Sequence, residues 1–236
     1  MSEPAHPPRP SDSGARTRLV IGGLSLTGPA ALIVALLLLG LFVWLIVWSR
    51  PSLGMLLAGG IWLGFVVFWS ATAHTAGTGR SEETPRSRAT RQQLMNLGLL
   101  LLFVPIPGLR WHYLPPNAWH VPAGLGIMAA ATLLHIWARA HLGRNWSSEV
   151  MIRPDHDLVR TGPYRILRHP IYTAILGLAA GTALVSGRVL SLVGAALFAY
   201  VYVRKLRLEE KALGGTFGAA WDDYRRHSWA LVPGVF

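Results

Sequence analysis

Residues 28–73 read GPAALIVALLLLGLFVWLIVWSRPSLGMLLAGGIWLGFVVFWSATA. This stretch contains two uncharged, mostly apolar runs, residues 28–48 and 52–73, which are separated by Arg50 and Pro51. An α-helix needs about 20 mostly apolar residues to cross a bilayer, and each run reaches that length. The stretch therefore predicts two membrane-spanning helices in an integral membrane protein.

Four more apolar runs follow, at residues 94–109, 119–138, 170–187 and 189–203. Pro105 and Pro107 are expected to kink or end the third span, because proline removes a backbone donor. Only Arg188 separates the last two runs, and their short length predicts a helical hairpin. We expect the second arm of this hairpin to continue past the membrane to about Leu213.

Apolar residues recur at helical spacing after the last run, at Leu213, Phe217, Trp221 and Tyr224. This pattern predicts an amphipathic helix that lies in the membrane interface. The predicted fold class is therefore an all-α integral membrane protein with about six transmembrane segments, the last two a short helical hairpin, plus a C-terminal interfacial helix. No G-x-G-x-x-G motif follows a strand, so no Rossmann domain is expected.

The chain has 236 residues, a formal net charge of +11, 52% hydrophobic residues, 14% charged residues and no cysteine. Soluble domains carry about 25% charged residues, so this chain has too little charge to cover a globular surface. The absence of cysteine excludes disulfides, thiolate catalysis and Cys-type metal sites. The basic residues lie between apolar runs, so we expect membrane lipids rather than nucleic acid as partners.

The distribution of basic residues predicts the orientation. The predicted outer turns hold Arg50, Arg110 and Arg188, which leaves 19 of the 22 basic residues on the other side. Because basic residues favour the cytoplasmic side of a membrane, both termini are predicted to be cytosolic. Residues 1–18 are rich in Pro, Ser and Arg and are predicted to form a disordered cytosolic tail, whereas residues 19–236 form a single membrane domain.

The connector between the fourth and fifth runs carries a polar motif. Residues 155–172 read DHDLVRTGPYRILRHPIY. Gly162-Pro163 is expected to form a turn, and Pro170 suits the first turn of a helix, where its missing N–H group costs nothing. His169 then lies at the N-terminus of that helix, where free N–H groups favour a carboxylate or a phosphate.

A second polar cluster, residues 204–211 (RKLRLEEK), follows the sixth run. Glu209 and Glu210 cost free energy at a membrane boundary unless they are paired. Adjacent residues on a helix point about 100° apart. We therefore expect one of these glutamates to hold an arginine and the other to face a cavity.

Together, these two clusters resemble a known family. The run GRNWS…HDLVRTGPYRILRHPIY, followed by EEKAL…FG…W…Y and the late Pro233, is similar to the isoprenylcysteine carboxyl methyltransferase family, of which phospholipid methyltransferases are close relatives. The resemblance covers residues 142–233 and implies an integral membrane enzyme that uses S-adenosylmethionine (SAM). It implies that residues 28–141 form the leading transmembrane helices and that residues 142–236 form a cofactor-binding and catalytic region with a cytosol-facing pocket.

The resemblance implies a SAM pocket that is built without a Rossmann fold and without a metal. His169 suits the carboxylate of the cofactor, and Glu209 or Glu210 balances its ammonium group or holds Arg168. The implied cofactor-binding residues are His156, Leu158, Val159, Gly162, Tyr164, Arg168, His169, Tyr172 and Glu209. The implied catalytic residues are Arg204, Lys205, Glu209 and Glu210.

The methyl acceptor is expected to be a lipidic or small hydrophobic molecule. A carboxylate acceptor needs a cation to orient it, for which Arg204 and Lys205 are candidates and Arg139 is a weaker one. An amine or thiol acceptor needs a base instead, such as Glu210 or His156. The catalytic arginine of the family falls on Lys205, and lysine lacks the bidentate fork of arginine.

Two other functions compete with methyl transfer. Sterol reductases resemble this family in their C-terminal half, so the same region is compatible with a membrane reductase that uses NAD(P)H. A non-enzymatic transporter or scaffold is the third function, and it predicts ionisable groups inside several spans or paired half-helices. The first four runs lack ionisable groups apart from histidine, which argues against transport.

Overall fold

The computed structural model of the protein describes residues 18–21, 24–27, 50–72, 80–81, 84–106, 109, 111–115, 119–143, 151–152 and 158–235. Three expectations lie outside these residues: the span at 28–48, the disordered tail at 1–18 except for Arg18, which begins a strand, and the role of His156. They stay predictions.

The chain divides into two compact units, residues 1–48 and 49–236, which are described separately. The first unit contains two short strands that pair in antiparallel fashion, β1 (Arg18–Ile21) and β2 (Leu24–Thr27). The second unit contains all of the described helices and a second antiparallel pair, β3 (Arg80–Ser81) and β4 (Met151–Ile152).

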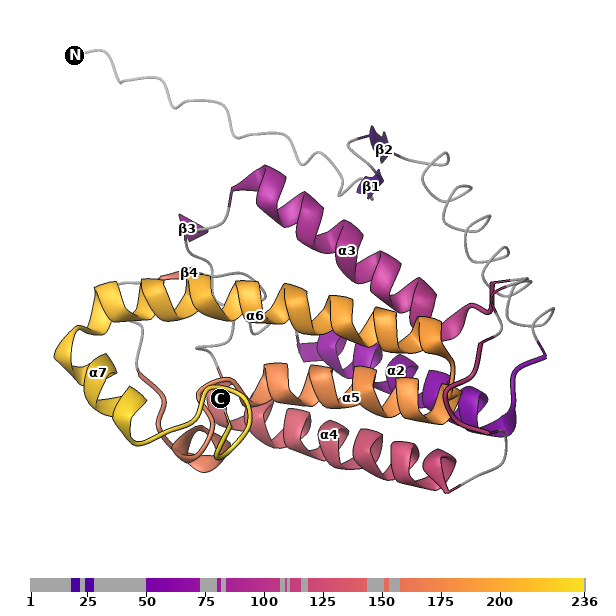
Figure 1. Cartoon of the computed structure of the whole chain (residues 1–236). Helices are drawn as coiled ribbons and strands as arrows, with labels where there is room; N and C mark the ends of the chain where they lie inside the picture. The colour runs from indigo at the N-terminus through magenta and orange to yellow at the C-terminus, as the bar shows by residue number, and fades with distance from the viewer. Residues whose placement is uncertain are drawn as a thin grey trace, which may run out of the picture. The chain divides into compact units, whose positions relative to one another are not determined.

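The second unit is a helical bundle (Figure 1). Its described α-helices are α2 (Leu53–Thr72), α3 (Pro85–Phe103), α4 (His120–Leu142), α5 (Pro170–Ser186), α6 (Val189–Phe217) and α7 (Ala219–Arg226). A short 3₁₀ helix, η3 (Gly162–Arg165), precedes α5. The predicted helical class is confirmed for the described part of the chain, and the two short strand pairs are an addition to it.

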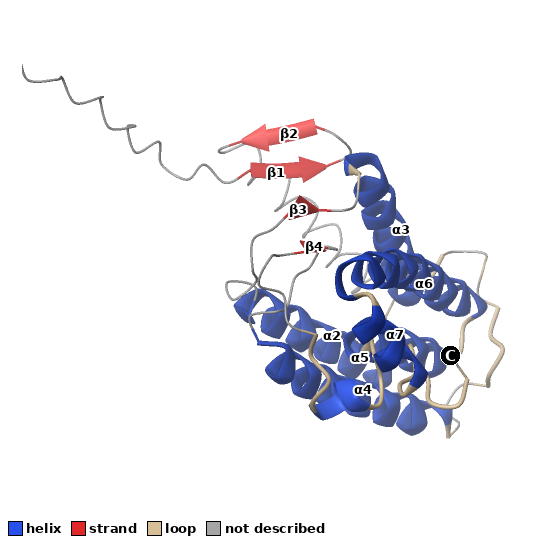
Figure 2. Cartoon of the chain, turned by 90° about the vertical axis from the view of Figure 1, so that its left-hand side faces the viewer, coloured by secondary structure: helices blue, strands red, loops and turns tan. Residues whose placement is uncertain are grey.

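Helix α5 packs against α4, α6 and α2, and α3 packs along α6 (Figures 1 and 2). The side chains of Met128, Leu178 and Leu102 are fully buried where these helices meet. A buried hydrogen bond from Trp62 Nε1 to Thr182 Oγ1 (2.9 Å) joins α2 to α5. Pairing both polar atoms matters here, because an unpaired buried polar group costs free energy.

Three of the described helices, α2, α4 and α6, are long and apolar enough to cross a membrane, and α5 is a shorter apolar helix. Large apolar side chains point away from the bundle: Leu53 is 72% exposed, Leu63 65% and Leu133 68%. A helix that is apolar on all sides is stable only in a protein core or in lipid. The described helices therefore indicate an integral membrane protein.

Helix α3 differs from the span predicted at residues 94–109. It begins at Pro85, where Thr84 caps the N-terminus by accepting a hydrogen bond from Ser87 N (3.3 Å). A capping threonine followed by proline is a strong helix start, and it outweighs the polar composition of the first turns. The helix ends at Phe103, before the two prolines that were expected to end it.

The hairpin of α5 and α6 is confirmed, and the turn between its arms ties it to α3. Gly187 ends α5 with a φ of +63°, and Arg188 is buried next to it. The Arg188 guanidinium donates to Leu102 O (3.0 Å) and Phe103 O (3.2 Å) at the end of α3. These carbonyls have no partner inside their own helix, and a cation at a helix C-terminus is favourable.

Close contact between α4 and α5 depends on glycine, which gives a testable prediction. A Cβ on Gly124 would lie 2.7 Å from Gly181 O and 2.9 Å from Val185 N, and backbone atoms cannot move aside. Gly124→Ala is therefore expected to destabilise the protein by about 1–3 kcal/mol, as overpacking does. The measurement is the thermal unfolding midpoint of the purified protein in detergent micelles.

Gly126→Ala is the matched control, because Gly126 lies in the same helix and a Cβ there meets nothing within 4 Å. This variant is expected to gain about 0.5–1 kcal/mol from the better helix propensity of alanine. Equal midpoints for the two variants would contradict the packing account.

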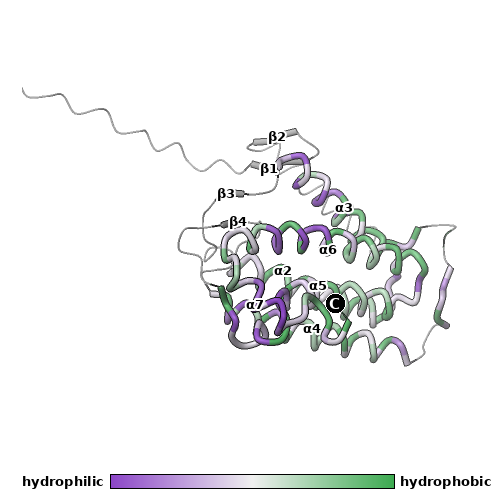
Figure 3. The backbone as a smooth tube through the Cα atoms, turned by 60° about the vertical axis from the view of Figure 1, so that its left-hand side comes forward, coloured by the Kyte–Doolittle hydropathy of each residue, from purple (hydrophilic) through white to green (hydrophobic). Residues whose placement is uncertain are grey.

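Helix α6 continues past the predicted span, which confirms the long second arm of the hairpin. Its hydrophilic turns lie in the half that leads to α7 (Figure 3). The predicted amphipathic helix through residues 213–224 is in fact two helices, because Gly218 has a φ of +50° and ends α6. The apolar face of α7 packs inward, with Trp221 and Tyr224 buried against the protein.

Candidate active site

The Arg-His-Pro motif lies at the start of α5. Pro170 occupies the first turn of the helix, as predicted, and His169 is the capping residue, only 6% exposed. The C-terminal segment 228–231 holds the motif in place: Arg168 N donates to Trp229 O (2.8 Å), and His169 N donates to Ala230 O (3.1 Å). Two stretches about 60 residues apart in sequence thus form one rigid support for the imidazole.

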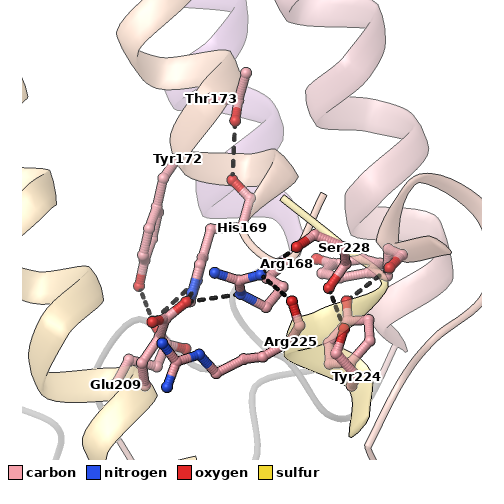
Figure 4. Close-up of polar contacts among 10 residues, drawn as sticks. Arg168, His169, Tyr172, Thr173, Glu209, Tyr224, Arg225 and Ser228 are labelled. Carbon is pink, nitrogen blue, oxygen red and sulfur yellow. Dashed lines mark hydrogen bonds and ion pairs between the residues drawn. The ribbon is translucent and has the colours of Figure 1, made fainter. Parts of the chain in front are cut away.

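Arg168 forms a largely buried ion pair with Glu210 of α6. Its Nε donates to Glu210 Oε1 at 2.8 Å, and the two side chains are 9% and 17% exposed. The same guanidinium donates through Nη1 to Ser228 O and to Arg225 O (Figure 4). A hydrogen bond in which the donor or the acceptor is ionised is about twice as strong as one between neutral groups. Glu210 thereby ties α6 to the motif.

Glu210 lies beyond the predicted span of α6, which ends at residue 203. Burial alone would raise the pKa of this carboxyl, but the imidazole of His169 and the guanidinium of Arg168 outweigh burial and lower the pKa to about 2. Glu210 is therefore a carboxylate over the whole physiological range, and its charge is already used by an arginine.

Glu209 lies on the Nδ1 side of the His169 ring, whereas Glu210 lies on the Nε2 side. Its Oε2 accepts a hydrogen bond from the Tyr172 hydroxyl and lies 3.8 Å from His169 Nδ1 (Figure 4). The rings of His169 and Tyr172 are stacked, with centroids 5.3 Å apart and an interplanar angle of 4°. As expected, one of the two acids, Glu210, holds an arginine. Glu209 stands beside the imidazole, and the cavity that it was expected to face stays a prediction.

One polar atom of this cluster is buried without a hydrogen bond. His169 Nε2 lies 3.4 Å from Glu210 Oε1 but does not meet the geometry of a hydrogen bond to any described residue. Leaving a buried donor or acceptor unsatisfied costs about 1–3 kcal/mol, so such atoms occur where a ligand or water completes the site. A polar ligand or a water molecule that reached this nitrogen would supply the missing partner.

Lys205 lies beside the stacked rings of His169 and Tyr172. Its Nζ lies 5.2 Å from the centroid of the Tyr172 ring, and the side chain is 7% exposed. Arg204, the neighbouring candidate, is exposed and stacks its guanidinium over Tyr200 at 5.9 Å. The structure therefore places Lys205, and not Arg204, beside Tyr172, whose ring stacks on His169.

The other predicted cofactor residues surround the turn before α5. Tyr164 is buried, and its burial and the negative charge of Glu209 both raise its pKa. Leu158 and Val159 are half-buried, and Val159 packs against the apolar core. Gly162 has a φ of +58°, and a Cβ there would lie 2.3 Å from the ring of His141, so this glycine is required by the turn.

Sequence reasoning missed the residues that join α7 to the motif. Arg160 donates to Asp223 Oδ2 (3.0 Å) and places its guanidinium 5.3 Å over the Tyr224 ring. Ser228 Oγ donates to Tyr224 O (2.6 Å). The available signal was the acidic pair at residues 222–223, which has a sign opposite to the basic motif.

The weaker candidate, Arg139, is a structural residue at the ends of two helices. It is 4% exposed and donates to Gly143 O (2.9 Å) and Thr72 O (2.8 Å). These carbonyls lie at the C-termini of α4 and α2, where the helix leaves acceptors unpaired. These two carbonyl partners account for the position of Arg139, so no role in orienting a methyl acceptor is needed to explain it.

A second testable prediction concerns the bond that fixes the turn. The Tyr224 hydroxyl donates to Tyr164 O at 2.6 Å, and burial raises the pKa of Tyr224 to about 12, so the donor proton is retained at working pH. Tyr224→Phe leaves that carbonyl unpaired and is expected to cost about 1–3 kcal/mol in denaturant unfolding. Tyr200→Phe, at an exposed ring, is the control and is expected to be neutral; equal losses would contradict the role of the bond.

Comparisons with known proteins give a family similarity for part of the chain. Residues 124–214 match the sequence profile of the isoprenylcysteine carboxyl methyltransferase (ICMT) family. Residues 124–214 are therefore similar to the ICMT family. The matched segment runs from α4 to α6 and contains the Arg-His-Pro motif and both glutamates, so the family resemblance of the sequence is confirmed.

The relatives are distant. Protein-S-isoprenylcysteine O-methyltransferase of Dictyostelium discoideum is 26% identical over 147 residues, which cover 59% of this chain and 61% of that protein. The nickel-cobalt-cadmium resistance protein NccN of Alcaligenes xylosoxydans xylosoxydans is 35% identical over 99 residues, 40% of this chain and 45% of that protein. The match with the first of these relatives thus spans less than two thirds of its length.

A solved structure of the eukaryotic intramembrane Ras methyltransferase ICMT superposes with a TM-score of 0.48 and 20% sequence identity, over 63% of this chain and 51% of that chain.

Proposed function

We propose that this protein is a SAM-dependent methyltransferase that acts on a lipidic or small hydrophobic acceptor. The observation that carries the proposal is the buried His169 Nε2, which lacks a hydrogen bond while its ring lies within 4 Å of carboxylate oxygens from both Glu209 and Glu210. The family relationship supports the same reading, because relatives of this chain are named O-methyltransferases.

The residues present fit the amino-acid end of SAM, which carries a carboxylate and an ammonium group. His169 offers a ring nitrogen to the carboxylate. Glu209 offers an acceptor to the ammonium group, because its side chain is 31% exposed and keeps free lone pairs beside its bond to Tyr172. When bound, SAM supplies a methyl group on a sulfonium that leaves as a neutral thioether, so the chain contributes mainly positioning and exclusion of water.

The geometry favours an acceptor that is already nucleophilic, such as a carboxylate. Glu210 is a poor base, because its pKa is about 2 and Arg168 occupies it. Lys205 is buried beside Tyr172 and offers a point charge that would orient an acceptor carboxylate. We therefore assign Glu209 and His169 to the cofactor, Lys205 to the acceptor, and Arg168 with Glu210 to positioning.

The test is transfer of a labelled methyl group from SAM to material extracted from membranes that contain the protein, with product detected by mass spectrometry. Glu209→Gln is expected to lower the rate at limiting SAM by about tenfold to a hundredfold, since it removes the charge that is proposed to hold the ammonium group of SAM. Asp222→Asn removes an exposed carboxylate of α7 and is expected to leave the rate unchanged. Unchanged transfer by Glu209→Gln, or reduction of an acceptor at the expense of NADPH, would overturn the proposal.

A further inference from the structure

A second polar site lies in a groove between α3 and α6, beside the candidate active site. Its lining residues are Ser87, Arg91, Leu94, Tyr200, Val201, Arg204, Lys205 and Leu208. On α3 these residues lie three or four positions apart, and on α6 they are two adjacent pairs four positions apart, followed by Leu208. They therefore form one face of α3 and one face of α6. The antiparallel packing of the two helices brings these faces together.

Three cations meet in this groove. Arg91 comes from α3, whereas Arg204 and Lys205 come from α6, and none of the eight described lining residues is acidic. Positive side chains from two helices favour an anion in the groove, and arginine matches the oxygens of a phosphate in particular.

The lining also contains the apolar residues Leu94, Val201 and Leu208, and it lies at the depth where the predicted membrane spans end. Leu94 and Val201 fall inside the predicted spans, whereas Arg91 precedes one span and Arg204 follows the other. Lipid phosphates occupy this depth, directly outside the hydrocarbon region. Tyr200 is 53% exposed and offers apolar surface beside the cations, where an acyl chain would lie.

We propose that this groove binds the phosphate of an anionic membrane lipid, with Arg91 and Arg204 on the phosphate and the acyl chains along Leu94 and Tyr200. A lipid accounts for both the charged and the apolar part of the lining, whereas free phosphate accounts only for the charge. The proposal does not depend on methyl transfer. Its test leaves Lys205 intact, because Lys205 also lies beside the active site.

The experiment titrates the purified full-length protein in detergent with short-chain phosphatidylglycerol and counts bound lipid by native mass spectrometry. Arg91→Gln and Arg204→Gln are each expected to weaken binding about tenfold or more, as the loss of a charged hydrogen bond does. The matched controls are Arg86→Gln on α3 and Arg207→Gln on α6, both exposed and outside the groove. Each control is expected to lose at most roughly fivefold, the general effect of one surface charge.

Parallel titrations use phosphatidylcholine and inorganic phosphate, and both are expected to bind more weakly than phosphatidylglycerol. Equal loss in all four arginine variants would show general surface attraction and overturn the site. Equal binding of inorganic phosphate would overturn the lipid assignment. Circular dichroism of each variant checks folding, and Arg204→Gln carries the test if Arg91→Gln unfolds, because Arg204 is exposed.

Discussion

His169→Ala is expected to weaken SAM binding by about tenfold to a hundredfold, the equivalent of one hydrogen bond between charged groups. The variant removes the buried Nε2 that is proposed to meet the cofactor carboxylate. It also removes the ring that stacks on Tyr172 and that stands within 4 Å of oxygens of Glu209 and Glu210. The measurement is isothermal titration of SAM into the purified variant and the unmodified protein.

Two controls separate binding from folding. His169→Gln keeps a donor of similar reach and is expected to recover part of the affinity. His112→Ala removes the side chain of an exposed histidine whose backbone pairs with that of Arg188, at the turn between α5 and α6 and away from the motif. It is expected to bind SAM as the unmodified protein does. Unimpaired binding by His169→Ala would remove this residue from the site.

Arg168→Met is expected to destabilise the protein by about 3–5 kcal/mol, because it leaves the buried Glu210 carboxylate without its partner. It also leaves the carbonyls of Arg225 and Ser228 without their donor. The measurement is denaturant unfolding in detergent, followed by helical circular dichroism.

The double variant Arg168→Met with Glu210→Met completes a mutant cycle. Replacing both members of a buried pair by apolar side chains of similar size is often close to neutral, so the double variant is expected to be more stable than Arg168→Met alone. If the two single losses simply add, the ion pair contributes nothing of its own.

The ion pair of Arg168 and Glu210 also determines how the free energy of unfolding depends on pH in acid. The folded pKa of Glu210, about 2, lies below the ordinary value of 4.5. A carboxyl with a lowered pKa stabilises the fold above its unfolded pKa and loses this contribution as the pH falls through its folded pKa. The free energy of unfolding of the unmodified protein should therefore fall as the pH is lowered from about 4.5 to about 2. In Glu210→Gln it should fall less over the same interval.

Much of the candidate site follows from local rules. Pro170 at the first turn of α5 and the different partners of Glu209 and Glu210 were predictable, because helix starts and helical periodicity depend on neighbours in the sequence. The hairpin turn at Arg188 was predictable for the same reason. What the residue pattern did not reveal is the partner of that arginine, because the end of α3 reaches it only through tertiary packing.

Some parts of the structure differ from the sequence-based predictions. The reasons are local backbone geometry in some places and long-range pairing in another. Hydropathy placed the start of the third span at residue 94, but the cap and proline at residues 84–85 begin the helix earlier. Gly218 ends α6 because its φ is positive, although the apolar spacing continues across it. The pairing of Leu167 with Trp229 joins segments far apart in sequence, and no local pattern predicts such a bridge.

The most direct test is an equilibrium titration of the unmodified protein with SAM and, separately, with NADPH. If the histidine and the acid beside it hold a methyl donor, SAM binds saturably at one site per chain, the demethylated product S-adenosylhomocysteine competes with it, and NADPH gives no saturable signal. Saturable binding of NADPH with none of SAM would contradict the account.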